Sequence, residues 1–361
     1  ILFFKFELNL KNYNKIYLKN MEGNRGFTNL NNTCYMNSAL QCLIHLEELN
    51  PRGKIFKENI IKSTKKEFVL LKQWIQLYKE MWDENDNDND IIHTLPFIRK
   101  FVQRCGEENI YFEVFNQNDV SEFLNGFITI LHEEICRSVT ITPSGPPKNE
   151  MDELQVKSIE TWDSFFNEKY SYIIQDFHSQ ALNMTCCPEC NYNTHNLDPL
   201  LIISLDIDDS TNNIKECFNN YIDDFNVDED NKWKCDECHE VVRCEKKNKF
   251  WRLSDIIIIL IKQYDNENKI NKFIEFPFNL NLEEYCINYK KLSMDYELQS
   301  MCIHNGSLNG GHYYAICKNN SDDNWRTYND SNVSDISDED VLKEKPYCLF
   351  YKRIELTDDM E

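Results

Sequence analysis

The sequence lacks any long apolar run. Its longest candidate covers residues 256–261, whereas a helix that spans a bilayer needs about 20 predominantly apolar residues. Residues 1–20 also make a poor signal peptide, because Lys5 and Glu7 interrupt their apolar part and no small-residue cleavage site follows. These absences predict a chain without a membrane partner, located in the cytoplasm, the nucleus or both.

Basic residues are scarce relative to acidic ones. Lys and Arg number 39 against 61 Asp and Glu, and the formal net charge is −22. Nucleic acids and anionic membranes bind to basic surfaces, so neither is expected as the principal partner. Two interpretations of the acidity stay open: a generally solvated surface, and a site that takes a basic substrate segment.

Cysteine, in contrast, is abundant. The chain has 15 cysteines and no recognisable secretory signal, so the thiols are expected in a reducing compartment as metal ligands, nucleophiles or buried apolar groups. We therefore expect no structural disulfide. A composition with 41% hydrophobic and 13% aromatic residues over 361 positions is typical of a globular protein with a substantial core.

Hydrophobic periodicity divides the chain into a helical part and a β-rich part. Apolar residues at spacings of three and four predict helices after Cys34, at 68–82 and at 118–135. The acidic tract 83–90 is expected to form a loop. After a turn-rich segment at 143–150, short apolar runs predict strands, and this order favours an α+β architecture with a mostly antiparallel sheet. The expected strands are 172–177, 200–205, 256–261, 298–303, 312–317 and 347–351.

Cys34 stands between a polar, turn-prone loop and the first predicted helix. The N–H groups at a helix N-terminus stabilise negative charge, and only the thiolate form of cysteine is a good nucleophile. Cys34 is therefore a candidate nucleophile, although a cysteine at a helix start is more often a small buried apolar residue. Asn29 is either a turn or cap residue, or a donor to the oxyanion formed when Cys34 attacks.

A thiol nucleophile needs a base, and His312 has the most suggestive setting among the 8 histidines. Paired glycines precede it and allow close approach of a substrate backbone, while a predicted strand after it holds the imidazole in place. His45 and His304 are weaker alternatives. Farther along, Asn329 and Asp330 are either an ordinary turn or the group that accepts the other imidazole N–H.

Two CxxC pairs form the other strong pattern. Four soft thiolates suit tetrahedral zinc and leave no position for water, so the metal is expected to be structural and no catalytic cofactor is expected. The long separation of the pairs predicts two hairpins whose tips meet in space, with a metal-free hairpin tip as the alternative. Cys186 and His239 are spare donors beside the pairs. The expected ligands are Cys187, Cys190, Cys235 and Cys238.

Together these motifs resemble the ubiquitin-specific protease family. Residues 26–43, GFTNLNNTCYMNSALQCL, are similar to the family's cysteine box GLxNLGNTCYMNSxLQ, and residues 304–317 with 325–333 are similar to its histidine box. The resemblance runs from about residue 26 to residue 352. It implies a cysteine-type deubiquitinase that hydrolyses the bond after the C-terminal glycine of ubiquitin on lysine-linked conjugates. Its expected partners are ubiquitin and ubiquitinated proteins, and the need for an activating partner protein stays open.

The resemblance also implies roles for individual residues. The segment around Gln117 is similar to the family's QQDAxEFL helix, which contacts the ubiquitin tail, and Asp119 and Glu122 match positions that hold its arginine-containing part. Two departures are Asn31, where the family usually has glycine, and Asn118, where it has a second glutamine. The implied catalytic set is Cys34 as nucleophile, His312 as general base, Asn29 in the oxyanion hole, and Asn329 as the residue that orients His312, with Asp330 assisting.

The implied fold is that of a papain-like cysteine peptidase with a helical thumb, a β-rich palm and zinc-tipped β fingers. The expected boundaries are an N-terminal extension at 1–22, a catalytic domain at 23–355 and a tail at 356–361. Within the domain, the thumb covers about 23–150, the fingers about 170–250 and the palm mostly 251–355. The alternatives are a catalytically inactive ubiquitin-binding scaffold and a hydrolase for another ubiquitin-like modifier. A zinc-ribbon interaction protein leaves both boxes unexplained.

Overall fold

A computed structural model describes residues 23–355 except 52, 54–55, 59, 61–67, 83–90, 142–144, 224–231, 244, 265–269 and 308–309. The expected extension 1–22, acidic loop 83–90 and tail 356–361 lie outside these residues. None of the helices described is both long enough and apolar enough to cross a membrane. In the same part of the chain, 14 cysteines are free thiols.

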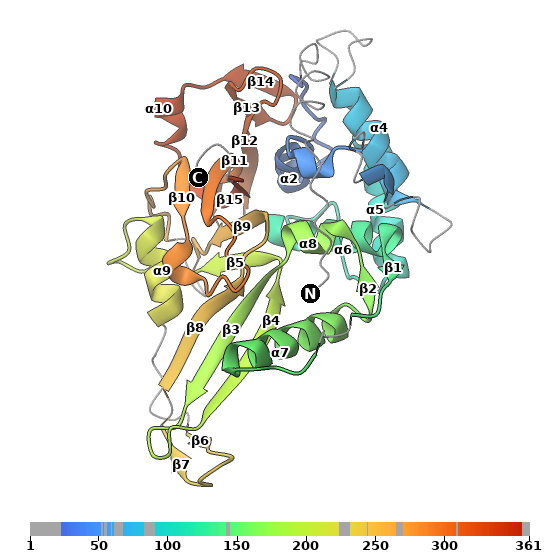
Figure 1. Ribbon diagram of the computed structural model, residues 1–361. Helices are drawn as coiled ribbons and strands as arrows, with labels where there is room; N and C mark the ends of the chain where they lie inside the picture. The colour runs from blue at the N-terminus through green and yellow to red at the C-terminus, as the bar shows by residue number, and fades with distance from the viewer. Residues whose placement is uncertain are drawn as a thin grey trace.

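Helices from the first part of the described chain gather on one side of the molecule (Figure 1). The helices predicted after Cys34, at 68–82 and at 118–135 are confirmed. An unexpected helix begins just after Thr94, has proline in its first turn and buries Phe97 and Phe101. The helices are α2 (Cys34–Ile44), α4 (Leu70–Trp82), α5 (Leu95–Glu107) and α6 (Val120–Ile135), with a 3-10 turn η1 (Glu47–Leu49).

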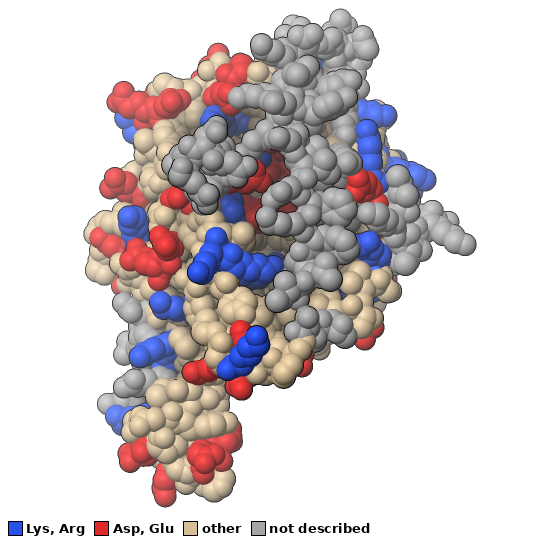
Figure 2. Space-filling view, in the orientation of Figure 1, with Lys and Arg blue, Asp and Glu red and all other residues tan. Residues whose placement is uncertain are grey.

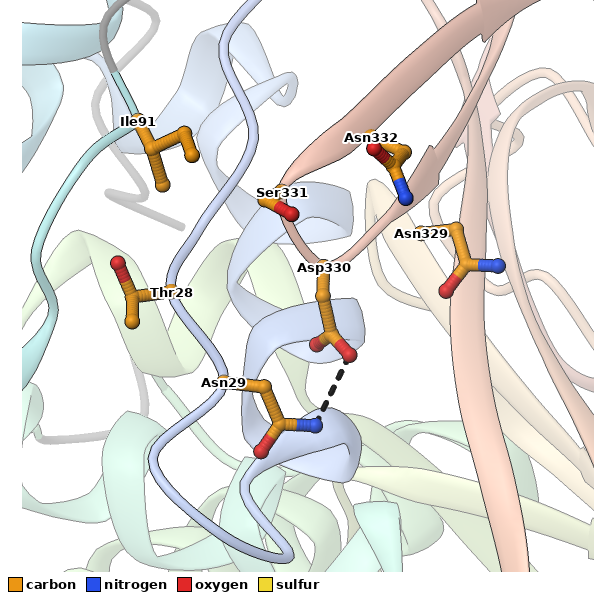
Figure 3. A pocket seen from close by; sticks show the side chains of 7 residues that line it. All are labelled: Thr28, Asn29, Ile91, Asn329, Asp330, Ser331 and Asn332. Atoms are coloured by element: carbon orange, nitrogen blue, oxygen red, sulfur yellow. Dashed lines mark hydrogen bonds between the residues drawn. The ribbon is translucent and has the colours of Figure 1, made fainter.

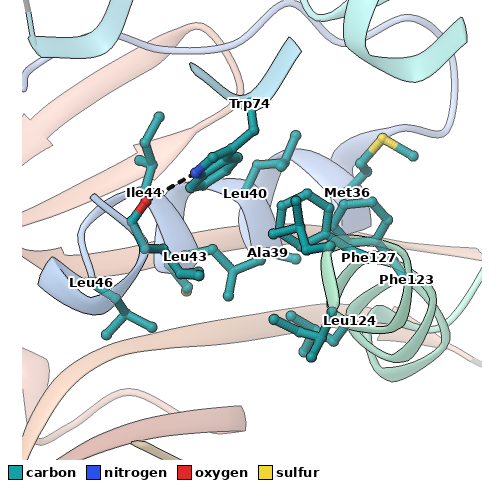
Figure 4. Close-up of a cluster of buried hydrophobic side chains, with 14 of the residues drawn as sticks. Met36, Ala39, Leu40, Leu43, Ile44, Leu46, Trp74, Phe123, Leu124 and Phe127 are labelled. Carbon is teal, nitrogen blue, oxygen red and sulfur yellow. Dashed lines mark hydrogen bonds between the residues drawn. The ribbon is translucent and has the colours of Figure 1, made fainter. Parts of the chain in front are cut away.

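Helix α2 is buried on all sides, although its sequence predicts only one apolar face. Every one of its residues is buried, and Met36 and Leu40 lie in the same hydrophobic cluster as Phe123 and Phe127 of α6 (Figure 4). Its polar side chains find partners inside the protein: Gln41 Nε2 donates to the carbonyl of Arg25 at 2.9 Å. A buried helix with hydrogen-bonded polar groups holds its first residue, Cys34, in place.

An eight-stranded sheet packs against α2. Its strand order is β14-β13-β12-β11-β15-β9-β5, and β10 pairs with β11. All pairs are antiparallel except β5 with β9, so the expectation of a mostly antiparallel sheet is confirmed. The strands are β5 (Ile202–Leu205), β9 (Ile256–Ile261), β10 (Asn279–Asn281), β11 (Asp295–Ser307), β12 (Gly310–Lys318), β13 (Trp325–Asn329), β14 (Asn332–Asp335) and β15 (Pro346–Arg353).

A second, three-stranded sheet projects away from the first (Figure 1). It consists of β3 (Ser179–Cys186), β4 (Asn193–Leu200) and β8 (Glu245–Arg252) in the order β4-β3-β8. At its far end lies the small hairpin of β6 (Trp233–Lys234) and β7 (Val241–Val242). Figure 2 shows acidic side chains on this tip, where Glu189, Asp236 and Glu240 are exposed.

The expected strand at 172–177 is wrong, because these residues form the short helix α8 (Tyr172–Phe177). A short apolar run has no periodicity that separates a strand from a buried helix. The change from helix to strand also comes later than expected. Helix α7 begins after Asn149, whose side chain accepts from the Asp152 N–H at 2.9 Å, a cap visible in the sequence. The remaining elements are α7 (Glu150–Phe165), α9 (Ile214–Asp223), α10 (Asp338–Val341), β1 (Arg137–Ser138), β2 (Lys169–Tyr170) and the 3-10 turn η2 (Glu283–Tyr285).

Candidate active site

Cys34 is the first residue of α2 and is 7% exposed. The loop before it turns sharply, because Asn31 and Asn32 have φ angles of 65° and 52°. Asparagine adopts this left-handed conformation more readily than most residues, so Asn31 meets the backbone need that glycine meets in the family motif. The loop thus places Cys34 at the N-terminus of α2, where its side chain is almost completely buried.

Burial raises the pKa of the Cys34 thiol above its ordinary value. The backbone N–H groups of Tyr313 and Tyr35 lower this pKa, and the Asp330 carboxylate raises it, but the effect of burial is the largest. The sequence favours a thiolate stabilised by the helix N-terminus, whereas in the structure burial opposes that stabilisation and has the larger effect on the pKa. Tyr313, whose backbone affects the Cys34 pKa, directly follows His312 on β12 (Gly310–Lys318). The Cys34 thiol is therefore near the strand that carries His312.

His312 Nε2 lies 2.6 Å from Asn329 Oδ1. An amide oxygen only accepts hydrogen bonds, so Nε2 must carry the proton and Nδ1 of the neutral ring is left as an acceptor. His312 lies on β12 and Asn329 ends the neighbouring strand β13. Among the described residues, no hydrogen bond joins Cys34 to His312, as is common before substrate binds.

Asp330 is held by two asparagines from the other side of the site. Asn29 Nδ2 donates to Asp330 Oδ2 at 2.9 Å (Figure 3), and Asn37 Nδ2 donates to Asp330 Oδ1 at 2.8 Å. Asp330 Oδ2 also lies 3.8 Å from His312 Nε2. This carboxylate therefore connects the loop before Cys34, the helix α2 and the histidine.

Asn37 is the functional residue that sequence reasoning missed. It lies one helical turn after Cys34 and is 2% exposed. Residues three apart share a helix face, so its position beside the Cys34 end of α2 was readable from the sequence. Its partner, Asp330, lies 293 positions away, and nothing local indicates that pairing.

The Asn29 side chain is fixed at both ends. Its Oδ1 accepts from the N–H and the hydroxyl of Thr33, both at 3.3 Å, while Nδ2 donates to Asp330. An amide nitrogen carries two N–H groups, so the second one is available to an oxyanion. This arrangement suits a preorganised donor, since no reorganisation is needed when charge develops.

The three residues expected to bind the ubiquitin tail do not all share one cavity. Gln117 and Glu122 line a cavity of about 660 Å³ together with the loop that holds Tyr111 and Asn118. Asp119 is instead the N-cap of α6: it accepts from the Ser121 N–H at 2.7 Å, and its other oxygen accepts from the Tyr347 hydroxyl. The Asp119 carboxylate therefore already has structural partners on α6 and β15.

The two CxxC pairs meet at the far end of the three-stranded sheet. The four sulfurs of Cys187, Cys190, Cys235 and Cys238 all lie within 4.8 Å of one another, and the pairs 187–238 and 190–235 are 3.8 and 3.6 Å apart. Zinc–sulfur bonds of about 2.3 Å in a tetrahedron place sulfurs roughly 3.8 Å apart. The donor set fits a metal ion, and this group includes neither Cys186 nor His239.

Comparison with known proteins is consistent with this geometry. The chain is 29% identical over 346 residues to human Ubiquitin carboxyl-terminal hydrolase 2. The aligned region covers 92% of this chain and 56% of that protein. It is 27% identical over 370 residues to Ubiquitin carboxyl-terminal hydrolase 4 of Saccharomyces cerevisiae, covering 91% and 39%. The chain thus spans about half the length, or less, of these relatives.

A solved structure shares the fold. The SAGA Ubp8/Sgf11/Sus1/Sgf73 DUB module bound to ubiquitin aldehyde matches with a TM-score of 0.70 and 25% identity, over 94% of this chain and 71% of that one. The expected α+β, papain-like fold is confirmed. The family profile described as Ubiquitin carboxyl-terminal hydrolase matches residues 25–351, from just before the Cys34 loop to the last strand of the sheet, and the chain belongs to this family.

Proposed function

We propose that this chain is a cysteine-type deubiquitinase that hydrolyses the bond after the C-terminal glycine of ubiquitin on lysine-linked conjugates. One observation carries the proposal. The His312 imidazole, held by Asn329 at 2.6 Å, lies on β12, the strand that packs against helix α2, whose first residue is Cys34. A thiol, a base and an orienting group in this order are the components of a cysteine peptidase.

In the first half of the reaction, His312 Nδ1 takes the proton of the Cys34 thiol as the sulfur bonds to the carbonyl carbon. Asn29 and backbone N–H groups stabilise the resulting oxyanion. The carbon–nitrogen bond then breaks, and His312 passes its proton to the leaving lysine amine. The products of this half are a free acceptor lysine and a thioester between ubiquitin and Cys34.

In the second half, His312 accepts a proton from water as the oxygen bonds to the thioester carbon. The carbon–sulfur bond breaks, His312 returns its proton to the Cys34 sulfur, and ubiquitin leaves as a carboxylic acid that gives its remaining proton to solvent. Asn329 keeps the His312 ring in one orientation throughout. Burial raises the pKa of Cys34, so transfer of the thiol proton to His312 is needed to form the attacking thiolate.

The cavity lined by Gln117 and Glu122 is the proposed path of the ubiquitin tail. The Glu122 side chain is exposed there, so its carboxylate can meet an arginine without first losing another partner. Asp119 adds negative charge nearby while its oxygens bind Ser121 and Tyr347. This local acidity gives part of the overall charge of −22 a use in recognition.

We also propose that Cys187, Cys190, Cys235 and Cys238 bind a structural zinc ion, because the sulfur spacing and the four thiolate donors suit it. Zinc would tie the two hairpins together and take no part in the reaction. The division into thumb (about 23–150), fingers (about 170–250) and palm (mostly 251–355) remains part of this proposal. So does a cytoplasmic or nuclear location, which keeps Cys34 reduced.

The test is hydrolysis of ubiquitin-aminomethylcoumarin by the purified chain and by Cys34→Ala. Turnover that depends on Cys34 supports the proposal, and absence of turnover in the parent chain contradicts it. The structure that shares the fold contains the subunits Sgf11, Sus1 and Sgf73, so every assay of the parent chain is run both without and with candidate partner subunits, and only inactivity under both conditions counts as absence of turnover. Labelling by ubiquitin-vinyl-sulfone, compared with probes for other ubiquitin-like modifiers, identifies the modifier.

A further inference from the structure

A second cavity adjoins the catalytic residues and differs from the proposed path of the ubiquitin tail. It has a volume of about 360 Å³ and is formed by the loop before α2, by Ile91 and by the turn between β13 and β14 (Figure 3). None of its residues lines the cavity at Gln117 and Glu122. Its lining is Thr28, Asn29, Ile91, Asn329, Asp330, Ser331 and Asn332.

The frame of this cavity is held by backbone hydrogen bonds between its three segments. Phe27 N–H donates to the Asp330 carbonyl at 2.7 Å, and Thr28 N–H donates to the Ile92 carbonyl at 3.0 Å. At Gly26, a Cβ atom would lie 2.5 Å from the backbone of Asp330 and Ser331, so only glycine permits this close approach. The cavity is therefore a preformed feature.

The loop between Thr28 and Cys34 connects the two cavities. Its first part, with Asn29, lines the smaller one, while Asn32 Nδ2 donates to the carbonyl of Phe115 at 3.1 Å, and the next residue, Asn116, lines the larger one. In amide hydrolysis the acyl group and the leaving amine lie on opposite sides of the attacked carbon. An acyl group that enters over Gln117 therefore directs its amine toward the smaller cavity.

The position of the general acid leads to the same assignment. His312 must give a proton to the leaving amine, so the two must be adjacent, and Asn329, which binds His312, lines the smaller cavity. We propose that this cavity is the subsite for the leaving group, and that it takes the peptide segment that carries the acceptor lysine. This assignment rests on the proposed deubiquitinase function.

The lining matches that occupant. Among the described residues that line it, Asp330 has the one charged side chain, and this carboxylate favours the amine as it becomes cationic. The amides and hydroxyls can bind a peptide backbone, and Ile91, 45% exposed, offers an apolar surface to the lysine stem. A volume of about 360 Å³ suits a short segment and is far too small for a second folded ubiquitin.

The experiment compares two substrates that share ubiquitin and differ in the leaving group. One is ubiquitin-aminomethylcoumarin, and the other is ubiquitin joined by an isopeptide bond to a five-residue peptide with a central lysine flanked by serines. Ile91→Ser should lower kcat/KM roughly five- to tenfold for the peptide conjugate and less than about twofold for the coumarin. Asn332→Arg, which fills the cavity, should act in the same direction.

Leu292→Ser is the matched control, because Leu292 is 47% exposed and lines neither cavity. It should change neither rate. Equal losses on both substrates, or no change on the peptide conjugate for both Ile91→Ser and Asn332→Arg, would overturn the assignment. A parent chain that hydrolyses neither substrate refutes the proposed function itself, and the subsite with it; coumarin turnover by the parent separates the two failures.

Discussion

The same chemical group serves two regions of this molecule in opposite settings. Cys34 is a single thiol, 7% exposed, at the start of a helix that is buried all round. The fingertip, which is the far end of the three-stranded sheet, instead gathers four thiols within 4.8 Å of one another. Cysteine becomes a nucleophile where one thiol meets a base, and a metal ligand where four thiols face each other.

The two regions also differ in how their residues come together. Each CxxC pair is a local turn, so half of the fingertip site forms from four consecutive residues. The active site joins the loop at Asn29 to Asp330, 301 positions away, and to His312 through Asn329. Mutations at the fingertip should therefore act on stability, whereas mutations at the active site should act on turnover.

The largest expected effect is that of Cys34→Ala. Removing the only nucleophile should lower kcat on the order of 10⁴-fold or more, while zinc content and ubiquitin affinity stay unchanged. Coumarin release, elemental analysis and a ubiquitin-binding measurement together check this. Activity close to that of the parent would end the mechanism, and loss of zinc in this variant would show that the two regions are coupled.

Asn29→Ala should lower kcat by roughly 10²- to 10³-fold, or about 3 to 4 kcal/mol, because one oxyanion donor is lost. KM should change little, since the donor acts on charge that develops only in the transition state. Steady-state kinetics on the coumarin substrate measure both constants. An effect confined to KM would assign Asn29 to substrate binding.

Asn329→Ala and Asp330→Ala should each lower kcat by roughly tenfold to a hundredfold, because one binds His312 and the other lies 3.8 Å from it. Both act on one imidazole, so the double variant should lose far less than the product of the single losses. An inert Asn329→Ala beside a severely impaired Asp330→Ala would make the aspartate the residue that orients His312.

Cys235→Ser should remove zinc and lower the free energy of unfolding by about 2 kcal/mol or more, a fall in Tm of roughly 3 °C or more for a chain of this length. The neighbouring variant Cys186→Ser is the control, because Cys186 lies outside the group of four sulfurs and should keep about one zinc per chain. Elemental analysis and thermal unfolding give the answer. If the parent chain contains no metal and Cys235→Ser is equally stable, the proposal that the four cysteines bind a structural zinc ion is wrong.

The smallest expected effect is a difference in alkylation between the two regions. Burial raises the pKa of Cys34 above its ordinary value, so its reaction with iodoacetamide should be slow at pH 7 and should become faster as the pH rises. Cys190 is exposed and should react faster once a chelator has removed bound metal. Peptide mapping by mass spectrometry measures both rates. A fast, pH-independent reaction of Cys34 would reveal a thiolate in the free chain.

Much of the proposed catalytic set could be named from the sequence, because its signals are local. The turn before Cys34, the glycines before His312 and the CxxC pairs each carry their chemistry within a few residues, and helices α2, α4 and α6 follow from apolar spacing. The prediction of a strand at 172–177 was wrong because the segment is short. Six residues contain too little periodicity to distinguish a strand from a helix.

Sequence alone thus determined which residue types carry the chemistry and the order in which they occur along the chain. Tertiary structure decided how they are paired. Three features depend on segments that meet only after folding. They are the hydrogen bonds from Asn29 and Asn37 to Asp330, the contact of the helix cap Asp119 with Tyr347, and the cavity at Ile91. Tertiary structure also raises the pKa of Cys34, because burial, which no local motif encodes, has a larger effect than the backbone N–H groups that lower this pKa.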